Sequence, residues 1–389
     1  MKKKYKICAL TTISKTMDWF IVDSMRNLSK NGYNVTLISN MEEGFIDRNS
    51  DYARCINLSM NRGVNIIDIF KCTYFLYKLF KKENFDIIYY TSPNASLYAS
   101  VAGFLSRTKV RYYSQCGLRY VSFIGIKRKI FKFVEKITCM FSTTIRAQSP
   151  LNMKFAIDEK LCSKEKISVV GIGGTTGVDL AKCDSFDHEK MKWILRNKYN
   201  IPQNTFLFGY VGRINADKGI NELIEAFIML QNKHNNIYLV LIGMMDYINP
   251  ISQKNIEIIK NNDHIITTGN VPPDQVYPHM AMLDVLTHPT YREGFGKVLQ
   301  EAMGVGIPVI TTNVPGPSEV IENNVSGILV NVKDVKDLAE KMVLLYMDKN
   351  LKDIFAIEGR ARAEKYFDRP IMLNNILDDI NKIMKVSSK

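Results

Sequence analysis

The chain has 389 residues, more than one hydrophobic core usually serves, so two domains are expected. Its 46% hydrophobic and 23% charged residues are typical of a globular protein and exclude a disordered or fibrous chain. The net charge of +13 lies in one half: residues 1–195 hold 31 Lys and Arg against 17 Asp and Glu, and residues 196–389 hold 21 against 22. The basic half indicates an anionic partner (nucleic acid, membrane surface or phosphorylated substrate) or simply a soluble basic surface.

The sequence predicts no membrane-spanning segment and no metal site. No run of 18 apolar residues occurs, so no transmembrane helix is predicted, and the basic start before a short apolar run predicts a first strand rather than a signal peptide. The seven cysteines form no CxxC pair and the five histidines do not cluster with them. This pattern favours reduced thiols in a cytoplasm and no metal site.

Short β-branched runs alternate with longer amphipathic stretches in the first half, which predicts an α/β domain with a parallel sheet covered on both faces. The expected strands are residues 5–10, 34–39, 86–91, 109–113, 143–147 and 167–170. The expected helices are residues 17–31, 66–82, 95–106 and 125–140. Residues 171–187, rich in glycine and polar side chains, are expected to be a connection.

The second half restarts the same pattern. The expected strands are residues 206–212, 238–243, 264–268, 285–288, 309–312 and 327–330, with helices at 220–232 and 296–304. We therefore expect two Rossmann-like domains, residues 1–195 and 196–369, with a ligand cleft at the strand carboxyl ends. A final helix is expected at about 370–385 and needs a surface to pack on. Residues 370–389 are therefore expected to form a C-terminal segment separate from both domains.

The strongest motif is the run from Tyr291 to Gly304, which follows the strand at 285–288. Gly294 and Gly296 permit a tight turn and close approach of a ligand. The helix that begins there offers unpaired N–H groups and a dipole that favours a diphosphate. The run contains two carboxylates, Glu293 on the loop and Glu301 on the helix.

The two carboxylates could be a glycosidase pair or hydroxyl ligands. A glycosidase pair lies about 5 to 9.5 Å apart, whereas helix rise alone separates residues eight apart by about 12 Å. Hydrogen bonding to ribose or sugar hydroxyls fits better, because a carboxylate accepts two such bonds. The remaining alternative is a strand–helix turn with two solvated carboxylates.

Two further motifs are expected beside the first. The run from Gly209 to Gly219 contains Arg213 and Lys218, which would bind phosphate as a bidentate group and as a point charge. Solvated surface cations are the alternative. Residues 309–319 form a buried strand and a Pro/Gly loop, for which a structural role is expected.

Together these strings resemble the retaining glycosyltransferases of family 4, which have the GT-B fold. Glu293 and Glu301 match the family's E-x7-E motif, and the run from Val211 to Gly219 matches its upstream motif. The resemblance implies that Arg213 and Lys218 hold the donor diphosphate, that Glu301 binds the ribose, and that Glu293 serves the sugar. It implies a last helix that crosses back onto the first domain. The implied donor site comprises Gly212, Arg213, Lys218, Glu293, Gly294, Phe295, Gly296, Lys297, Val298 and Glu301, of which Glu293, Arg213 and Lys218 are the expected catalytic residues.

The first half narrows the resemblance to the capsular and O-antigen branch, which includes the bacillosamine-extending galactosaminyltransferase and acts on undecaprenyl-diphosphate-linked acceptors. Residues 11–20, 115–120 and 173–179 match it. The acceptor-side candidates are Thr11, Thr12, Gln115, Gly117 and Arg119. The chain lacks the glycine-rich first loop of many members, and it has Gln115-Cys116-Gly117 where they have a histidine.

Absences in the sequence favour the retaining, metal-independent mode. The first half has no His before His188 that could serve as a general base, and no D-x-D motif occurs in the chain. Arg213, Lys218 and the helix N-terminus would neutralise the leaving diphosphate instead of a cofactor or metal ion. The resemblance implies a UDP-sugar donor, and the expected reaction moves a hexose or N-acetylhexosamine from it. A non-hydrolysing epimerase or a non-catalytic nucleotide-sugar binder is the alternative.

The basic segment 119–141 interleaves cations with apolar residues. It is either a basic amphipathic helix that lies on an anionic membrane or an ordinary helix with a solvated basic face. With the implied lipid-linked acceptor, the expected location is the cytoplasmic face of the inner membrane. No nucleic-acid motif is found.

Overall fold

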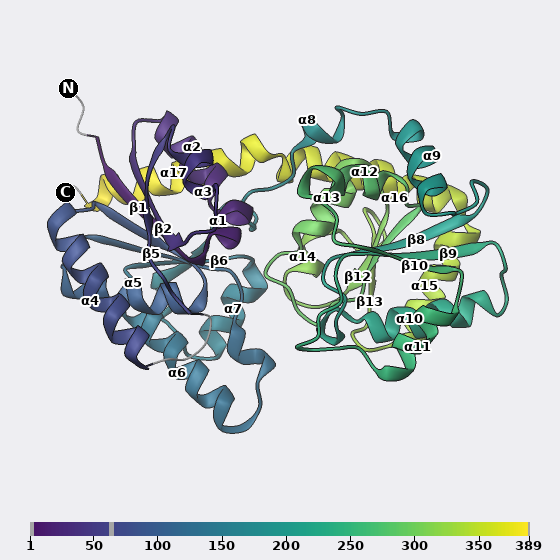
Figure 1. Cartoon of the computed structure of the whole chain (residues 1–389), viewed down its shortest axis with the longest axis horizontal. Coiled ribbons are helices and arrows are strands. Elements are labelled where there is room, and N and C mark those ends of the chain that lie inside the picture. The colour runs from purple at the N-terminus through teal and green to yellow at the C-terminus, as the bar shows by residue number, and fades with distance from the viewer. Residues whose placement is uncertain (1–3, 62–65, 388–389) are drawn as a thin grey trace. The chain divides into compact units, whose positions relative to one another are not determined.

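The computed structural model describes residues 4–61 and 66–387, without the side chains of Ile66, Arg119 and Ser122. The chain forms two compact units, Met1–Thr176 with Pro370–Lys389, and Gly177–Arg369. Each unit is one parallel sheet with helices on both faces, as expected (Figure 1). In the described part of the chain no helix is long and apolar enough to span a membrane.

The sheet of the first unit has seven parallel strands in the order β3-β2-β1-β4-β5-β6-β7. Its strands are β1 (Lys6–Ile13), β2 (Asn34–Asn40), β3 (Ala53–Asn57), β4 (Ile87–Tyr90), β5 (Val110–Gln115), β6 (Thr144–Ala147) and β7 (Ile167–Val169). Its helices are α1 (Ser14–Phe20), α2 (Val22–Lys30), α3 (Phe45–Asn49), α4 (Ile66–Glu83), α5 (Pro93–Leu105), α6 (Gly125–Phe141), α7 (Pro150–Asp158) and α17 (Arg369–Ser387), with short turns at Arg119–Ser122 and Lys164–Lys166.

Both faces of this sheet are buried because successive side chains of a strand point to opposite faces. On β1, Ile7 and Ala9 join the core under α1, α2 and α17, whereas Cys8 and Leu10 join the core under α4, α5 and α6. This burial on both faces explains why the strands read as nearly continuous apolar runs.

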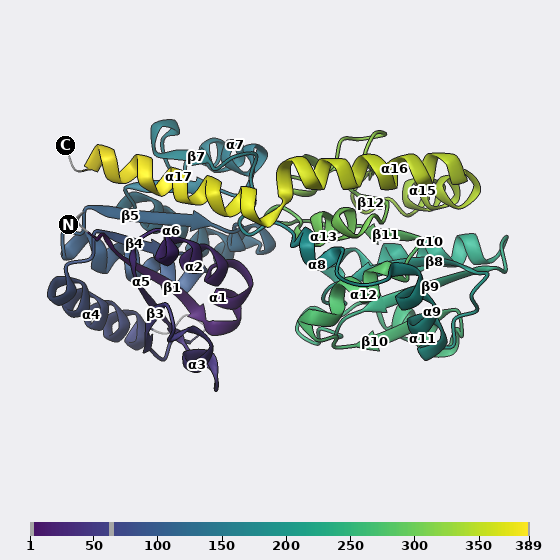
Figure 2. The same ribbon diagram turned by 90° about the horizontal axis from the view of Figure 1, so that it is seen from above.

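The C-terminal helix α17 packs on the first unit, as Figure 2 shows. Ile376, Ile380 and Met384 enter its core. Asp379 accepts two hydrogen bonds from Arg146, at 2.9 and 2.8 Å, and one from the hydroxyl of Tyr112 at 3.0 Å. The helix therefore belongs to the first unit although the chain reaches it through the second.

The second unit has a six-stranded parallel sheet in the order β10-β9-β8-β11-β12-β13. Its strands are β8 (Phe206–Val211), β9 (Ile237–Ile242), β10 (Ile265–Gly269), β11 (Val285–His288), β12 (Val309–Thr312) and β13 (Ile328–Val330). Its helices are α8 (Leu180–Cys183), α9 (His188–Lys198), α10 (Ile220–Gln231), α11 (Gln253–Asn261), α12 (Val276–Ala281), α13 (Lys297–Val305), α14 (Pro317–Val320), α15 (Val335–Met347) and α16 (Lys349–Arg362), with short turns at Ala216–Lys218, Pro273–Gln275 and Ala363–Phe367.

The unit boundary lies earlier than the expected residue 195, because residues 177–195 belong to the second unit. Helix α9 is fixed there by Arg196, which is fully buried and binds Asp284 at 2.8 Å and the carbonyl of Met282. Lys192 binds the same carboxylate at 3.0 Å. The charge shift near residue 195 therefore does not mark the structural boundary.

Strand order sets the place of a ligand site. In the second sheet the order reverses between β8 and β11, so the loops that follow these strands leave in opposite directions. Doubly wound sheets bind ligands at this switch point, outside the carboxyl ends of the strands. Arg213 and Lys218 follow β8, and Glu293 follows β11.

Candidate donor site of the second unit

The loop after β8 is held tightly against the end of β11. The side chain of Asn215 accepts the backbone N–H of Lys218 at 3.1 Å and so caps the short turn that presents this lysine. Gly219 has φ +69°, and a Cβ there would lie 2.0 Å from the carbonyl oxygen of Pro289. Only glycine permits this approach of the two loops.

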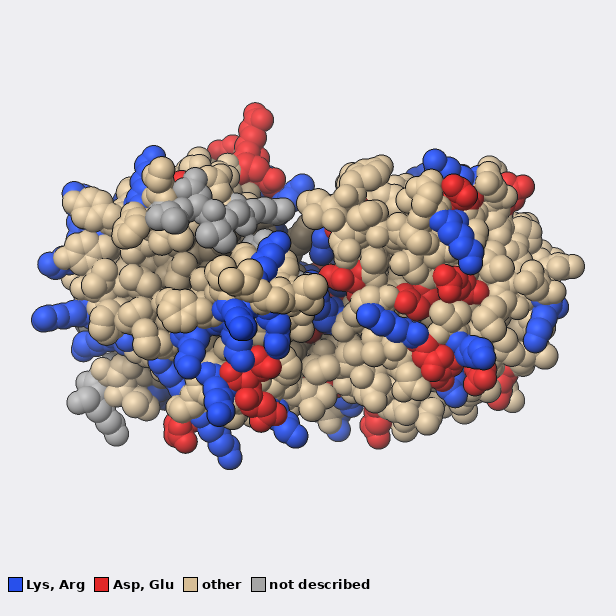
Figure 3. Space-filling model, turned by 90° about the horizontal axis from the view of Figure 1, so that it is seen from below, with Lys and Arg blue, Asp and Glu red and all other residues tan. Residues whose placement is uncertain are grey.

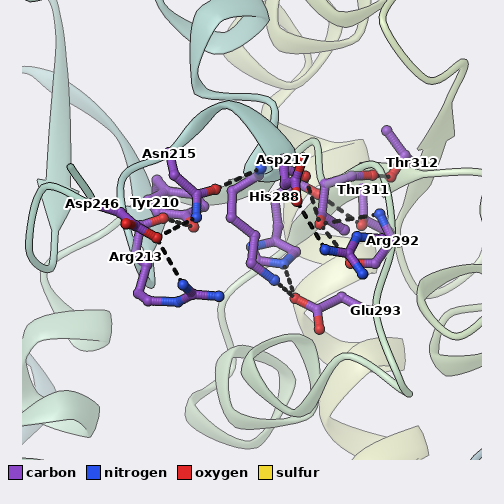
Figure 4. A network of polar contacts seen from close by, with 12 residues as sticks. Tyr210, Arg213, Asn215, Asp217, Asp246, His288, Arg292, Glu293, Thr311 and Thr312 are labelled. Atoms are coloured by element: carbon purple, nitrogen blue, oxygen red, sulfur yellow. Dashed lines mark hydrogen bonds and ion pairs between the residues drawn. The ribbon is translucent and has the colours of Figure 1, made fainter. Parts of the chain in front are cut away.

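The loop after β11 is tied to the same turn and to β12. The backbone N–H of Tyr291 donates to the carbonyl of Asp217 at 2.9 Å, and Arg292 binds the Asp217 carboxylate at 2.9 Å. On the other side, the hydroxyl of Thr311 donates to the carbonyl of His288 at 2.9 Å. These bonds fix the backbone on both sides of Glu293 (Figure 4).

Lys218, Glu293 and His288 form the centre of the site. Figure 4 labels His288 and Glu293. One oxygen of Glu293 is in direct contact with the ammonium of Lys218 and lies 3.3 Å from Nε2 of His288. Because an ionised carboxylate only accepts, Nε2 of His288 is the donor. The side chains of Lys218 and Glu293 are 17% and 24% exposed, so a ligand can reach the pair.

The local charges keep Glu293 ionised. Burial alone would raise the pKa of this carboxyl, but the charge of Lys218 and the hydrogen bond from His288 outweigh burial and lower the pKa to about 2. Burial lowers the pKa of His288, which is therefore a neutral imidazole near pH 7. Its ring stacks on Tyr210, with ring centres 5.5 Å apart.

Arg213 stands at the edge of the site. Its side chain is 70% exposed, and its guanidinium binds Asp246, which follows β9, at 2.7 Å. Asp246 also accepts the amide of Asn215 at 3.0 Å. This hydrogen bond, the one from the backbone N–H of Ile248 and the charge of Arg213 lower the pKa of its carboxyl. Arg213 is thus oriented but open to an anion.

Helix α13 begins beside Glu293. Gly316 of the Pro/Gly loop packs on this turn: a Cβ at Gly316 would lie 2.8 Å from the carbonyl oxygen of Gly294. Phe295 is buried against Phe367, and Gly296, with φ +78°, is the residue before the helix. The expected structural role of the Pro/Gly loop is therefore support of the Gly294–Gly296 turn.

Glu301 lies on the first turns of α13, within 3.7 Å of Lys297. Burial raises the pKa of its carboxyl, while Lys297 and Arg369 oppose this change. Val298 is half-buried on the same turn. Glu301 and Glu293 thus differ in environment: Glu293 is paired by strong contacts, and Glu301 is held by longer-range charges.

The acceptor-side candidates lie in the first unit, and the side chains of Thr11, Thr12 and Gln115 form hydrogen bonds within that unit. Thr12 contacts the hydroxyl of Ser92 at 2.9 Å, and Thr11 donates to the carbonyl of Ile13. Gln115 is buried and donates to Glu135 at 2.9 Å. Gly117 has φ +106° and open space at its Cβ position, and the side chain of Arg119 lies outside the described residues.

Sequence reasoning missed three residues of this site: His288, Asn215 and Asp246. His288 is the last residue of β11 and therefore lies at the carboxyl edge of the sheet, which is the one sequence signal that could have found it. Among the residues that the structure describes, no group of three or more His, Cys, Asp or Glu could hold a metal ion.

Comparison with known proteins shows the family of the chain. Residues 191–362 match the family model described as glycosyl transferases group 1, and residues 6–149 match the model described as glycosyl transferase 4-like. The chain is 31% identical over 387 residues to the capsular polysaccharide biosynthesis glycosyltransferase CapM of Staphylococcus aureus, covering 99% of both chains.

Two further relatives extend the comparison. The chain is 25% identical to the N,N'-diacetylbacillosaminyl-diphospho-undecaprenol alpha-1,3-N-acetylgalactosaminyltransferase of Campylobacter jejuni, over 83% of this chain and 84% of that enzyme. The fold of the present chain matches that of Anabaena HepE, which was solved in complex with UDP. The TM-score is 0.77 at 16% sequence identity, and the match covers 98% of this chain and 100% of HepE.

Two doubly wound parallel sheets with a C-terminal helix on the first unit define the GT-B class of glycosyltransferases. The chain belongs to the glycosyl transferases group 1 family, the family 4 enzymes that its motifs resemble.

The pairing of Glu293 predicts a pH-dependent contribution to stability. Since its pKa is lowered from 4.5 to about 2 in the folded state, the ionised form stabilises the fold above about pH 4.5, and this contribution is lost as the pH falls toward 2. In urea denaturation, the free energy of unfolding of wild type minus that of Glu293→Gln should therefore decrease as the pH is lowered from about 5 to about 3.

The control is Glu340→Gln, at an exposed position of α15. Its difference from wild type should stay constant across the same pH range. A constant difference for Glu293→Gln would show that Lys218 and His288 do not lower the pKa of this carboxyl.

Proposed function

We propose that the protein is a retaining, metal-independent glycosyltransferase that moves a sugar from a UDP-sugar to a lipid-linked saccharide during surface polysaccharide synthesis. The observation that carries the proposal is the Lys218–Glu293–His288 cluster at the switch point of the second sheet. It brings a cation for a phosphate and a carboxylate for a sugar hydroxyl to one place.

The donor diphosphate is proposed to bind between Lys218, Arg213 and the turn that opens α13. Lys218 supplies a point charge and Arg213 an exposed planar guanidinium. The backbone N–H groups after Gly294 add the partial positive charge of a helix N-terminus. These groups would stabilise the charge that develops on the leaving diphosphate, with no cofactor.

The two carboxylates are proposed to recognise the two sugars of the donor. Glu301, further along α13, would accept hydroxyl hydrogen bonds from the ribose. Glu293 would accept hydroxyl hydrogen bonds from the transferred sugar. Lys218 and His288 both contact its Oε1 atom, and Oε2 takes no part in these two contacts. UDP is the proposed nucleotide, supported by the shared fold with HepE.

The retaining mode is supported by the chemistry of Glu293. A carboxyl with a pKa of about 2 that is paired with a lysine is a weak base and does not hold a proton near neutral pH. It suits a charge-stabilising and sugar-orienting role. The leaving diphosphate itself is then proposed to take the proton of the acceptor hydroxyl, on the face where the new bond forms.

The acceptor is proposed to be an undecaprenyl-diphosphate-linked saccharide. CapM is named for capsular polysaccharide synthesis, and the Campylobacter relative for a diphospho-undecaprenol substrate. We place this acceptor at the carboxyl edge of the first sheet, beside Thr11, Thr12, Gln115, Gly117 and Arg119. The enzyme would then work at the cytoplasmic face of the inner membrane, with its basic first unit toward anionic lipid.

Donor binding can be tested without the acceptor. Calorimetry with UDP, GDP and ADP in metal-free buffer should show saturable binding of UDP. Glu301→Ala should weaken it about 10- to 100-fold, because hydrogen bonds to a charged group contribute about 1.5–3 kcal/mol. Glu340→Ala, a surface carboxylate of the same unit, should bind as wild type. Absence of nucleotide binding by the folded wild type would refute the proposed donor site.

Transfer can be tested with the donor that binds and a lipid-linked acceptor. The reaction should proceed in EDTA, and NMR of the product should show the anomeric configuration of the donor. Lys218→Met should lower kcat by about 10²–10³-fold, since it removes a group that stabilises developing charge. Lys233→Met, at an exposed position beyond α10, should have little effect. Loss of activity in EDTA or an inverted anomer would contradict the mechanism.

A further inference from the structure

Helices α4 and α6 of the first unit present apolar side chains to solvent on the outside of one helical layer. α5 packs between them, and most of its residues are buried. A helix that covers a sheet normally buries its apolar stripe and exposes a polar one. Helix α4 buries one apolar stripe and exposes a second, whereas α6 buries a mixed face and exposes an apolar stripe.

On α6 the inward face is formed by Glu135, Thr138 and Cys139, all buried. The outward face carries Ile126, Ile130 and Phe133, which are 78%, 51% and 64% exposed. These three residues are spaced by four and three positions, so they form one stripe along the helix.

On α4 the inward face is formed by Cys72, Leu76 and Phe80. The outward face carries Ile67, Phe70 and Tyr74, which are 74%, 73% and 58% exposed. Their spacing of three and four positions again makes one stripe. Single exposed apolar residues are ordinary, but two such stripes on one layer indicate an interaction surface.

The surface is strongly basic. Lys127, Lys129 and Lys136 are exposed on α6, whose single carboxylate, Glu135, is buried. On α4, Lys71 and Lys78 are exposed beside the apolar stripe. Figure 3 shows blue Lys and Arg side chains spread over this face of the first unit, with fewer red Asp and Glu side chains among them.

We infer that the outward faces of α4 and α6 together form a docking surface for an anionic lipid bilayer. We name this set the α4/α6 face: Ile67, Phe70, Lys71, Tyr74, Lys78, Ile126, Lys127, Lys129, Ile130, Phe133 and Lys136. Apolar side chains would enter the boundary between headgroups and acyl chains, and the lysines would reach the lipid phosphates.

The lysines favour a bilayer over a protein partner. Lysine is depleted in protein–protein interfaces, whereas interfacial membrane helices combine lysines with Leu, Ile and Phe. Each lysine near an anionic surface adds to the attraction, which falls with salt. Only the purpose assigned to the α4/α6 face, access to a lipid-linked acceptor, rests on the proposed function.

The test uses the full chain and vesicles that contain no acceptor. Wild type should sediment with vesicles of phosphatidylcholine and phosphatidylglycerol, far less with phosphatidylcholine alone, and less as salt rises. Ile130→Ser/Phe133→Ser on α6 and Phe70→Ser/Tyr74→Ser on α4 should each weaken sedimentation about tenfold or more.

The matched control is Ile354→Ser/Ile357→Ser on α16 of the second unit. These isoleucines are 51% and 67% exposed, and Asp353 and Glu358 are their neighbours in sequence. This variant should bind vesicles as wild type. Thermal melts and UDP binding report folding of all variants, because the α4/α6 face contains no residue of the candidate donor site.

The outcomes separate the two proposals. Wild type that stays in solution with anionic vesicles, or folded α4 and α6 variants that bind as wild type, would overturn the docking surface. A change of oligomeric state in these variants without a change in vesicle binding would also overturn it, in favour of a protein contact. Vesicle binding without any nucleotide binding would retain the surface and remove the proposed donor site.

Discussion

The ion pair between Lys218 and Glu293, completed by His288, is the interaction on which the candidate donor site depends. It requires two loops from neighbouring strands to approach within backbone contact, and Gly219 permits this approach to Pro289. The approach occurs at the switch point between β8 and β11, where doubly wound sheets bind their ligands. Strand order therefore decides where the charges meet.

Charge in the site is balanced before a ligand arrives. Lys218 is paired with Glu293, Arg213 is paired with Asp246, and His288 is neutral. Under the proposed function, a diphosphate would compete with these two carboxylates for the same cations. This competition would lower the affinity for a nucleotide alone, and the sugar contacts would then favour the complete donor, which is one way to obtain specificity from a difference of affinities.

Much of the fold could be predicted from the sequence, since apolar runs and turn residues locate the strands of a parallel sheet. The expected strands correspond to β1, β2 and β4–β13, whereas β3 (Ala53–Asn57) was missed. This strand lies at the edge of the sheet and pairs on one side only. Its sequence, ARCIN, is short and does not form a continuous apolar run. The expected helix at 17–31 is two helices, α1 and α2, which meet at Ile21.

The sequence predicted the places of Glu293 on a loop and Glu301 on a helix, as the structure has them, and the roles of both residues stay predictions. Asp246 was missed because its partner Arg213 lies 33 residues away and no local pattern marks it, whereas the one signal for His288 is its place at the end of β11. The α4 face was missed for another reason. Apolar residues lie on more than one side of this helix, so its sequence does not show which stripe packs inward. Packing of α5 against it decides that Phe70 and Tyr74 face outward.

The most direct test of the account compares the affinities of UDP and of the matching UDP-sugar by calorimetry, for wild type and Glu293→Gln. The account predicts that wild type binds the UDP-sugar more tightly than UDP. Glu293→Gln should bind UDP at least as tightly as wild type, because a competing carboxylate is removed from Lys218, but it should no longer distinguish the UDP-sugar from UDP. Equal weakening of both ligands, or unchanged discrimination, would contradict the assignment of Glu293 to the transferred sugar.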